Sequence, residues 1–332
     1  MIYILCAFIT SSLLTYFLSR QSVEFFQDTP NQRSLHSVPT PRSGGIAIVI
    51  GMGLSTLAIF VSVDNDFILP TNYLIGCLLI AIVSFMDDLF HLSPLTRLLF
   101  QSLAALLVVF SSSLYSPGNI TAIGGMVLLL VVLAVVWSIN LYNFMDGMDG
   151  FAGGMSVIGF STLAIIGYLS GADGYGIFCA MIASAAAGFL IWNFPPARIF
   201  MGDLGSTTLG YLMAVMSIYG VVEKIFPWWC PVIIFAPFWL DASLTLLKRI
   251  LAGKRFWEAH REHYYQRLVL AKHTHRQVVL WEYALMILSA VSVVFGYLSE
   301  ILLEGALVPI AWLFVYIALL VCLECHLRRL SV

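Results

Sequence analysis

The sequence Asn140-Leu-Tyr-Asn143-Phe-Met-Asp146-Gly-Met-Asp149-Gly150 directly follows an apolar run of helical length, residues 121–139. Its four polar side chains recur every three residues in a chain that is otherwise mostly apolar. A charged group at membrane depth costs several kcal/mol, so such groups are kept where they face water, a partner or a substrate. The spacing places the four side chains along one side of a helix end. We therefore expect a membrane-spanning helix that ends in a polar functional site.

A plainer interpretation of Asp146 and Asp149 is a hydrated turn, because Asp-Gly is a common turn dipeptide. A turn of this kind does not require Asn140 and Asn143, which lie just upstream at the same spacing. The two asparagines therefore favour a functional site over a simple turn.

The composition of the whole chain is that of an integral membrane protein. Of its 332 residues, 60% are hydrophobic and 10% are charged, whereas soluble domains carry roughly 25% charged residues. Apolar runs of about 17 to 22 residues, long enough to cross a bilayer as helices, recur along the sequence. They lie at 1–19, 44–62, 70–86, 98–116, 121–139, 152–170, 175–192, 205–222, 227–247, 279–299 and 303–325. The sequence thus predicts an all-α polytopic membrane protein with about 11 transmembrane helices.

Residues 1–332 are expected to form a single integral-membrane domain, because no repeat of fixed period and no low-complexity linker divides them. The first apolar run has no basic residues before it and no small-residue cleavage signal after it, so we expect a retained span. The net charge of −2 does not indicate a nucleic-acid partner, and we expect none. The expected surroundings are instead a lipid bilayer.

Basic residues set the expected orientation, because short loops rich in Lys and Arg stay in the cytoplasm. Fifteen of the sixteen basic residues follow odd-numbered spans, and only Lys224 falls on the opposite side. We therefore expect the N-terminus outside and the C-terminus in the cytoplasm. The loops after the first, third, fifth, seventh and ninth spans then share the cytoplasmic face, and they carry nearly all the polar clusters.

Five carboxylates are expected on this cytoplasmic face. They are Asp87, Asp88, Asp146, Asp149 and Asp203. Few lysines balance them, so they would repel one another unless a divalent cation lay among them. Oxygen ligands of this kind suit Mg²⁺, with Mn²⁺ as an alternative, and such a cation commonly holds a diphosphate. The cluster therefore predicts phosphoryl-transfer chemistry.

Several of these polar residues also have a plainer structural interpretation. Asp87 and Asp88 end a span and could be charges that meet the lipid headgroups. Asp203 precedes Gly205-Ser-Thr and could cap a helix N-terminus, a place that also binds phosphate. The basic loop 248–276 could serve mainly as a cytoplasmic anchor. Within it, His260 and His263 are three residues apart and are expected on one helical face, where they could contact a diphosphate.

Five motifs run in order between about residues 30 and 270. They are Arg33-x-x-His36 through Pro-Thr-Pro-Arg42-Ser-Gly-Gly45, Asp87-Asp88, Asn140-x-x-Asn143-x-x-Asp146-Gly-Met-Asp149-Gly, Asn193-Phe-Pro-Pro-Ala-Arg-Ile-Phe200-Met-Gly-Asp203-x-Gly-Ser and His260-x-x-His263. Their order and spacing resemble the polyprenyl-phosphate N-acetylhexosamine-1-phosphate transferases of glycosyltransferase family 4. That family includes the phospho-N-acetylmuramoyl-pentapeptide translocase and the enzymes that start O-antigen on undecaprenyl phosphate.

The resemblance implies Mg²⁺-dependent transfer of a sugar 1-phosphate from a UDP-sugar to undecaprenyl phosphate in the bacterial inner membrane, with release of UMP. It implies that Asp203 and Asp88 bind the metal. It also implies that Phe200 stacks on uracil. The implied catalytic residues are Asp87, Asp88, His260 and His263. The implied substrate-binding residues are Asn140, Asn143, Asp146, Asp149, Asn193, Phe200, Arg42 and Arg97. A homodimer is left open as the assembly.

The chain departs from the translocase pattern at two places. His260-Arg-Glu-His263 stands where the translocase has a triple histidine, and a lysine expected near Ser37 is missing. We therefore expect that murein-precursor synthesis is not its role. His91 stands where enzymes that transfer N-acetylglucosamine 1-phosphate often carry an Asp. This favours the O-antigen subgroup thought to use N-acetylated 6-deoxyhexosamines, with the identity of the sugar left open.

A transporter or channel with intramembrane carboxylates is the alternative from another class. It predicts polar residues near the middle of the spans, whereas here they lie at cytoplasmic ends, apart from Asp241. A phosphotransferase that uses a CDP-alcohol would need a denser Asp-Gly-Ala-Arg type of helix motif, which the sequence lacks.

Overall fold

The computed structural model describes residues 1–20, 27–28, 39–61, 69–111, 122–255, 260–299 and 307–330. Within these ranges, nine helices are long and apolar enough to cross a membrane, and α1 (Ile2–Leu18) is a shorter apolar helix. The all-α polytopic fold predicted from the sequence is therefore confirmed. The direction in which the chain crosses the membrane and its single-domain organisation remain predictions.

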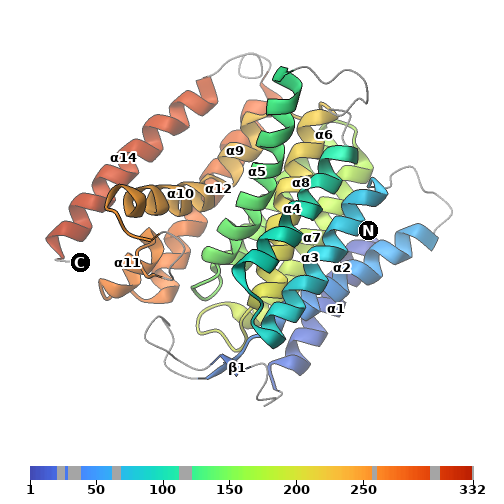
Figure 1. The fold of residues 1–332 in the computed structure, drawn as a ribbon, viewed down its shortest axis with the longest axis horizontal. Coiled ribbons are helices and arrows are strands. Elements are labelled where there is room, and N and C mark those ends of the chain that lie inside the picture. The colour runs from blue at the N-terminus through green and yellow to red at the C-terminus, as the bar shows by residue number, and fades with distance from the viewer. Residues whose placement is uncertain are drawn as a thin grey trace.

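The N-terminal two thirds of the chain form one bundle of long helices (Figure 1). After α1, they are α2 (Gly44–Val61), α3 (Thr71–Phe90), α4 (Pro94–Ser111), α5 (Ala122–Phe144), α6 (Phe151–Leu169), α7 (Asp173–Asn193) and α8 (Gly202–Val222). The most buried of the candidate spans is α8, which packs against α2, α3 and α5. This packing brings together the helix ends that carry the polar motifs.

A two-stranded antiparallel ladder lies beside this bundle. It pairs β1 (Gln27–Asp28) with β2 (Thr40–Pro41), just before α2 begins. Since β2 leads directly into Arg42 and the first turn of α2, the ladder helps to fix the entry of the chain into that helix.

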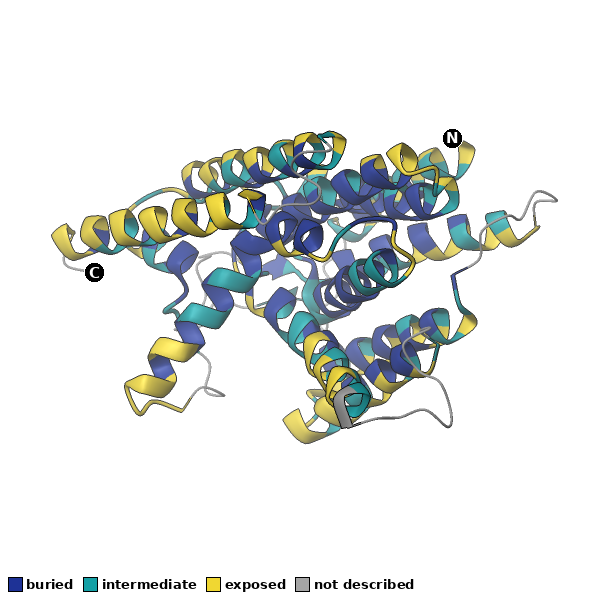
Figure 2. Cartoon of the chain, turned by 90° about the horizontal axis from the view of Figure 1, so that it is seen from above, coloured by how far each residue is buried: buried dark blue, intermediate teal, exposed yellow. Residues whose placement is uncertain are grey.

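The remaining helices form a second group at the C-terminal end. They are α9 (Trp229–Ile234), α10 (Ala236–Leu251), α11 (Tyr264–Leu270), α12 (His275–Leu298) and α14 (Leu307–Arg329). The last of them lies apart from the main bundle in Figure 1, and Figure 2 shows it as mostly exposed. Its exposed side chains are largely apolar, as expected for a helix that faces lipid.

One expected span, 227–247, is not a single helix. The structure divides this region into α9 and α10, with Phe235 between them. The cause is Pro237, which has no backbone N–H to donate to the preceding turn and whose ring crowds the carbonyl four residues earlier. The break places Asp241 in the second turn of a new helix, close to the expected cytoplasmic face.

Candidate active site

The carboxylates of Asp87 and Asp88 lie in the last turn of α3, which continues to Phe90 beyond the expected apolar run. Both residues are buried. The Asp87 Oδ1 atom accepts the backbone N–H of Leu92 at 2.7 Å, which closes the end of the helix. Its Oδ2 atom lies 3.0 Å from Nη1 of Arg97, in the first turn of α4. Asp87 therefore joins the end of α3 to the start of α4.

Asp88 caps a different helix from its own. Its Oδ1 and Oδ2 atoms accept the backbone N–H groups of Asp203 at 3.2 Å and Leu204 at 3.0 Å, in the first turn of α8. A carboxylate is stabilised there because the N-terminus of a helix carries unpaired N–H donors and a partial positive charge. The alternative that Asp203 itself caps α8 is wrong, since the N-cap position is Met201 and Asp203 lies within the helix.

The Asp203 carboxylate is contacted by side chains from two further helices. Asn143, at the end of α5, donates from Nδ2 to Asp203 Oδ1 at 2.9 Å and to Ser206 Oγ at 3.0 Å. Arg97 Nη1 lies 3.8 Å from Asp203 Oδ2 as well as 3.0 Å from Asp87. The ends of α3, α4, α5 and α8 thus meet around three carboxylates and one guanidinium.

Arg42 holds the chain before α2 against this site. Its Nη2 atom donates to the backbone carbonyl of Asp88 at 2.8 Å. Three backbone hydrogen bonds continue the contact: Gly44 N to Phe200 O at 2.9 Å, Gly45 N to Met201 O at 2.7 Å and Phe200 N to Pro41 O at 2.7 Å. The backbone of Phe200 is therefore fixed, while stacking of its ring on uracil remains a prediction.

Replacing Gly45 by Ala should destabilise this contact. A Cβ atom at Gly45 would lie 2.3 Å from the backbone nitrogen of Gly205, a distance that requires α2 and α8 to separate. We expect a loss of about 1–3 kcal/mol in the free energy of unfolding, the usual cost of overpacking. The measurement is the thermal unfolding midpoint in detergent. Gly53→Ala is the matched control, because a Cβ atom at Gly53 would meet no atom within 4 Å, and an equal loss in both variants would contradict the prediction.

The loop that carries Asp149 is held by hydrogen bonds within the protein. Asp149 Oδ2 accepts the N–H of Ala197 at 3.0 Å, and its Oδ1 lies 3.2 Å from Nδ1 of His275. The buried Asn193 accepts the N–H of Gly150 at 2.9 Å and donates to the carbonyl of Ile199 at 2.9 Å. Both motif residues therefore shape the loop, and their substrate-binding roles remain predictions. His275, which no motif includes, is thereby paired with Asp149.

Asn140 lies one turn further from the carboxylates. Its Nδ2 atom donates to Oε1 of the buried Gln101 at 2.7 Å and to the carbonyl of Val136 at 2.7 Å. Gln101 is one of the few polar residues in the apolar run of α4, and this position in the sequence could have indicated a buried polar contact. The contact between Gln101 and Asn140 links α4 to α5 one helical turn after Arg97. Substrate binding by Asn140 remains a prediction.

The negative charge of Asp146 is opposed by its surroundings. Burial, and then the negative charges of Asp203, Asp88 and Asp149, raise the pKa of Asp146 well above its usual value. This side chain is therefore close enough to the other carboxylates to feel their charge. A cation among them would relieve the repulsion.

In the absence of divalent cations, the folded protein should lose stability as the pH rises from about 4, the ordinary carboxyl pKa, through the raised pKa of folded Asp146. Stability falls as the pH rises because the folded state holds the Asp146 proton more tightly than the unfolded state does. Asp146→Asn should remove that part of the pH dependence. Thermal unfolding between pH 4 and pH 8 in EDTA measures it, with Asp173→Asn as the control. An unchanged pH slope in Asp146→Asn would contradict the prediction.

His260 and His263 lie side by side, with ring centroids 4.9 Å apart. The expectation that they share one helical face is wrong, because α11 begins at Tyr264 and both histidines precede it. Burial, and then the neighbouring His263 and Arg249, lower the pKa of His260 to about 4. Its Nδ1 accepts the N–H of Glu262 at 3.3 Å, so the neutral ring carries its proton on Nε2.

The start of α11 is attached to the polar loop after α5. Tyr265 donates its hydroxyl to the carbonyl of Phe144 at 3.0 Å. The rings of Phe144 and His263 stack with centroids 6.3 Å apart. The structure thus brings His263 to the loop that carries Asp146, although the two are more than a hundred residues apart in the chain.

Comparisons with known proteins show the family of this chain. The family model described as "Glycosyl transferase family 4" matches residues 71–221, which include Asp87, Asp88, Asn143 and Asp203. The "Probable undecaprenyl-phosphate N-acetylglucosaminyl 1-phosphate transferase" of Bacillus subtilis (strain 168) is 31% identical over 307 residues, covering 89% of this chain and 85% of the relative. The chain belongs to glycosyl transferase family 4.

Two further relatives of this chain differ in coverage. The "Decaprenyl-phosphate N-acetylglucosaminephosphotransferase" of Mycobacterium leprae (strain TN) is 31% identical and covers 83% of this chain and 79% of its own length. The "Phospho-N-acetylmuramoyl-pentapeptide-transferase" of Staphylococcus aureus (strain MSSA476) is 32% identical over 210 residues, or 56% of this chain and 64% of its own. The family resemblance found in the motifs is therefore confirmed.

The donor set of this family 4 chain suits a hard divalent cation, although no three His, Cys, Asp or Glu side chains among the described residues converge as a complete site. Asp87, Asp88 and Asp203 offer carboxylate oxygens, the ligands that Mg²⁺ prefers. Mg²⁺ commonly binds one or two carboxylates and completes its shell with water and substrate phosphates. The donors therefore fit a cation that binds together with a phosphate substrate. The motif residues Arg33 and His36 lie outside the described part of the chain.

Proposed function

We propose that this protein transfers an N-acetylhexosamine 1-phosphate from a UDP-sugar to undecaprenyl phosphate. The products are the lipid diphosphate sugar and UMP. The protein would act in the bacterial inner membrane as the first enzyme in the synthesis of a cell-envelope polysaccharide such as O-antigen. Support comes from the names of the relatives, which describe transfer of sugar phosphates to polyprenyl phosphates. The observation that carries the proposal is the meeting of Asp87, Asp88, Asp203 and Arg97 at the ends of three helices.

The carboxylates and Arg97 have complementary tasks in this reaction. A divalent cation, Mg²⁺ or Mn²⁺, would be held by Asp203 and Asp88 and would neutralise charge on the diphosphate. Arg97, 40% exposed in its side chain, can turn its guanidinium from the carboxylates to a phosphate oxygen. Asp87 lies at the end of α3 and can accept the remaining proton of the lipid phosphate.

We propose direct attack by an oxygen of the lipid phosphate on the phosphorus that carries the sugar, with UMP as the leaving group. A phosphate that arrives laterally in the membrane reaches the end of α3 before it reaches the loop with Asp146. The alternative is a double displacement through a covalent enzyme intermediate. That alternative requires exchange of labelled UMP into UDP-sugar by enzyme that has been freed of all polyprenyl phosphate, and such exchange would discard direct attack.

The proposal is tested by UMP release from purified protein in detergent. The reaction should require a UDP-N-acetylhexosamine, undecaprenyl phosphate and Mg²⁺ or Mn²⁺ together, and excess EDTA should stop it. A panel of UDP-N-acetylglucosamine and its 6-deoxy relatives identifies the sugar. Absence of UMP with every member of the panel would contradict the proposal and would favour the transporter alternative, for which proton-coupled uptake into proteoliposomes is the direct measurement.

A further inference from the structure

We propose that Asp241 of α10 positions His263 for the transfer reaction, although none of the sequence motifs includes Asp241. The inference rests on the proposed function and on the catalytic role that the family resemblance implies for His263. Asp241 Oδ1 lies 3.2 Å from His263 Nδ1, and both residues are buried, with 8% and 3% of their surfaces exposed. An ionised carboxylate can only accept hydrogen bonds. Asp241 therefore fixes the proton of His263 on Nδ1, so that Nε2 of the neutral ring carries the lone pair.

The same carboxylate also fixes the backbone around His263. Asp241 Oδ1 accepts the N–H of Tyr264 at 3.0 Å, and Oδ2 accepts the N–H of Tyr265 at 3.1 Å, in the first turn of α11. Thr245 donates its hydroxyl to Asp241 Oδ1 at 3.1 Å. The carboxylate is thus held by one donor from its own helix and orients three donors of the segment 263–265. The ring and the backbone of His263 cannot move independently of Asp241.

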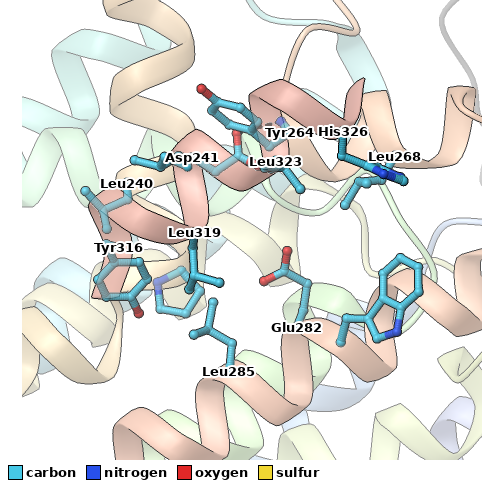
Figure 3. A pocket seen from close by; sticks show the side chains of 13 residues that line it. Leu240, Asp241, Tyr264, Leu268, Glu282, Leu285, Tyr316, Leu319, Leu323 and His326 are labelled. Atoms are coloured by element: carbon cyan, nitrogen blue, oxygen red, sulfur yellow. Dashed lines mark hydrogen bonds between the residues drawn. The ribbon is translucent and has the colours of Figure 1, made fainter. Parts of the chain in front are cut away.

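The surroundings of Asp241 strengthen these contacts. Figure 3 shows Asp241 and Tyr264 beside an apolar pocket between α10, α11, α12 and α14. The pocket has a volume of about 280 Å³, and Leu240, Leu268 and Leu323 line it together with the carboxylate of Glu282. In an environment of low polarity, hydrogen bonds to a charged acceptor are stronger than in water, and losing them is more costly. The arrangement matches the way a buried carboxylate orients a histidine in other enzymes.

Asp241 is connected to the end of α5 through the segment 263–265, since Tyr265 also donates its hydroxyl to the carbonyl of Phe144. The His263 ring stacks with the rings of Phe144 and Tyr265, with centroids at 6.3 Å and 5.9 Å. Phe144 is two residues before Asp146. The ring is therefore held between Asp241 and the polar loop, in a position that a change of tautomer or a small rotation would disturb.

The main test is a double-mutant cycle on the rate of UMP release. Asp241→Asn should lower kcat on the order of 10- to 100-fold with little change in KM, because general acid–base and orienting contributions act on the chemical step. Asp241→Asn combined with His263→Gln should be no more than about twofold slower than His263→Gln alone, since residues that act as a unit are not additive. Multiplicative losses would overturn the proposal and assign Asp241 a general role in folding.

A second measurement does not depend on transferase activity. Carbethoxylation of His263 by diethyl pyrocarbonate, mapped by mass spectrometry, reports how firmly the ring is held. Asp241→Asn should speed this reaction several-fold, and Thr245→Val should speed it less. Asp173→Asn, which removes an exposed carboxylate far from the site, should leave it unchanged. An unchanged rate in Asp241→Asn would overturn the proposal, whereas absence of UMP release by the unaltered protein would contradict only the proposed function.

Discussion

Replacing Asp203 by Asn should abolish sugar-phosphate transfer, with a loss of at least about 10³-fold in kcat, or roughly 4 kcal/mol of transition-state stabilisation. The reason is that an amide oxygen is a poor substitute for a carboxylate that binds a cation. The fold should survive, because the new side chain can still accept the hydrogen bond that Asn143 donates at 2.9 Å. UMP release at saturating Mg²⁺ measures the loss, and thermal unfolding checks the fold.

Asp173→Asn is the control for this prediction, since it also removes one carboxylate but from the exposed start of α7. It should retain the activity of the unaltered protein. Full turnover by Asp203→Asn would refute the metal-binding role of Asp203 and require another group to hold the diphosphate.

The neighbouring carboxylates of α3 should respond differently to the same substitution. Asp88→Asn should be inactive throughout pH 5 to 8.5, because it removes both a proposed cation ligand and one of the two acceptors that cap α8. Loss of the cap should also lower the free energy of unfolding by roughly 1 kcal/mol. UMP release across this pH range, together with thermal unfolding, separates the two effects.

Asp87→Asn should lose most activity below pH 6 and recover partly as the pH rises. The lipid phosphate carries its second proton below a pKa of about 6, so a proton acceptor is needed there and less so above it. The new amide can still accept the N–H of Leu92, which Asp87 accepts at 2.7 Å. Equal and pH-independent losses in the two variants would contradict the separate roles.

The sequence predicted the membrane class and most helix positions, because long apolar runs have few alternatives in a bilayer. It did not predict the break at Phe235, since an apolar run that contains Pro231 and Pro237 can be a kinked span or two helices. It also placed the end of the third span too early. Asp87 and Asp88 extend α3 because the ends of other chain segments, at Arg97 and in α8, supply their partners.

The sequence predicted which residues form the candidate site better than it predicted the contacts among them. Spacing along the chain identified Asn143, Asp146 and Asp203 as polar residues at one face. It could not show that Asp88 caps α8, that His275 pairs with Asp149, or that Asp241 meets His263, because each contact joins segments far apart in sequence. Gly45 belongs to one of the motifs. A glycine is needed there because α8 approaches closely, and only the packing of the helices reveals this approach.

The backbone contact between the start of α2 and the residues before α8 has a mechanical consequence. Main-chain hydrogen bonds at Gly44 and Gly45, two residues without a Cβ atom, hold the two segments at close range. Arg97, by contrast, contacts Asp87 and Asp203 through charged side chains that can exchange partners. We therefore expect the contact at α2 to be the stiffer side of the site, and any widening that admits the proposed phosphate substrate to come from the side formed by α4.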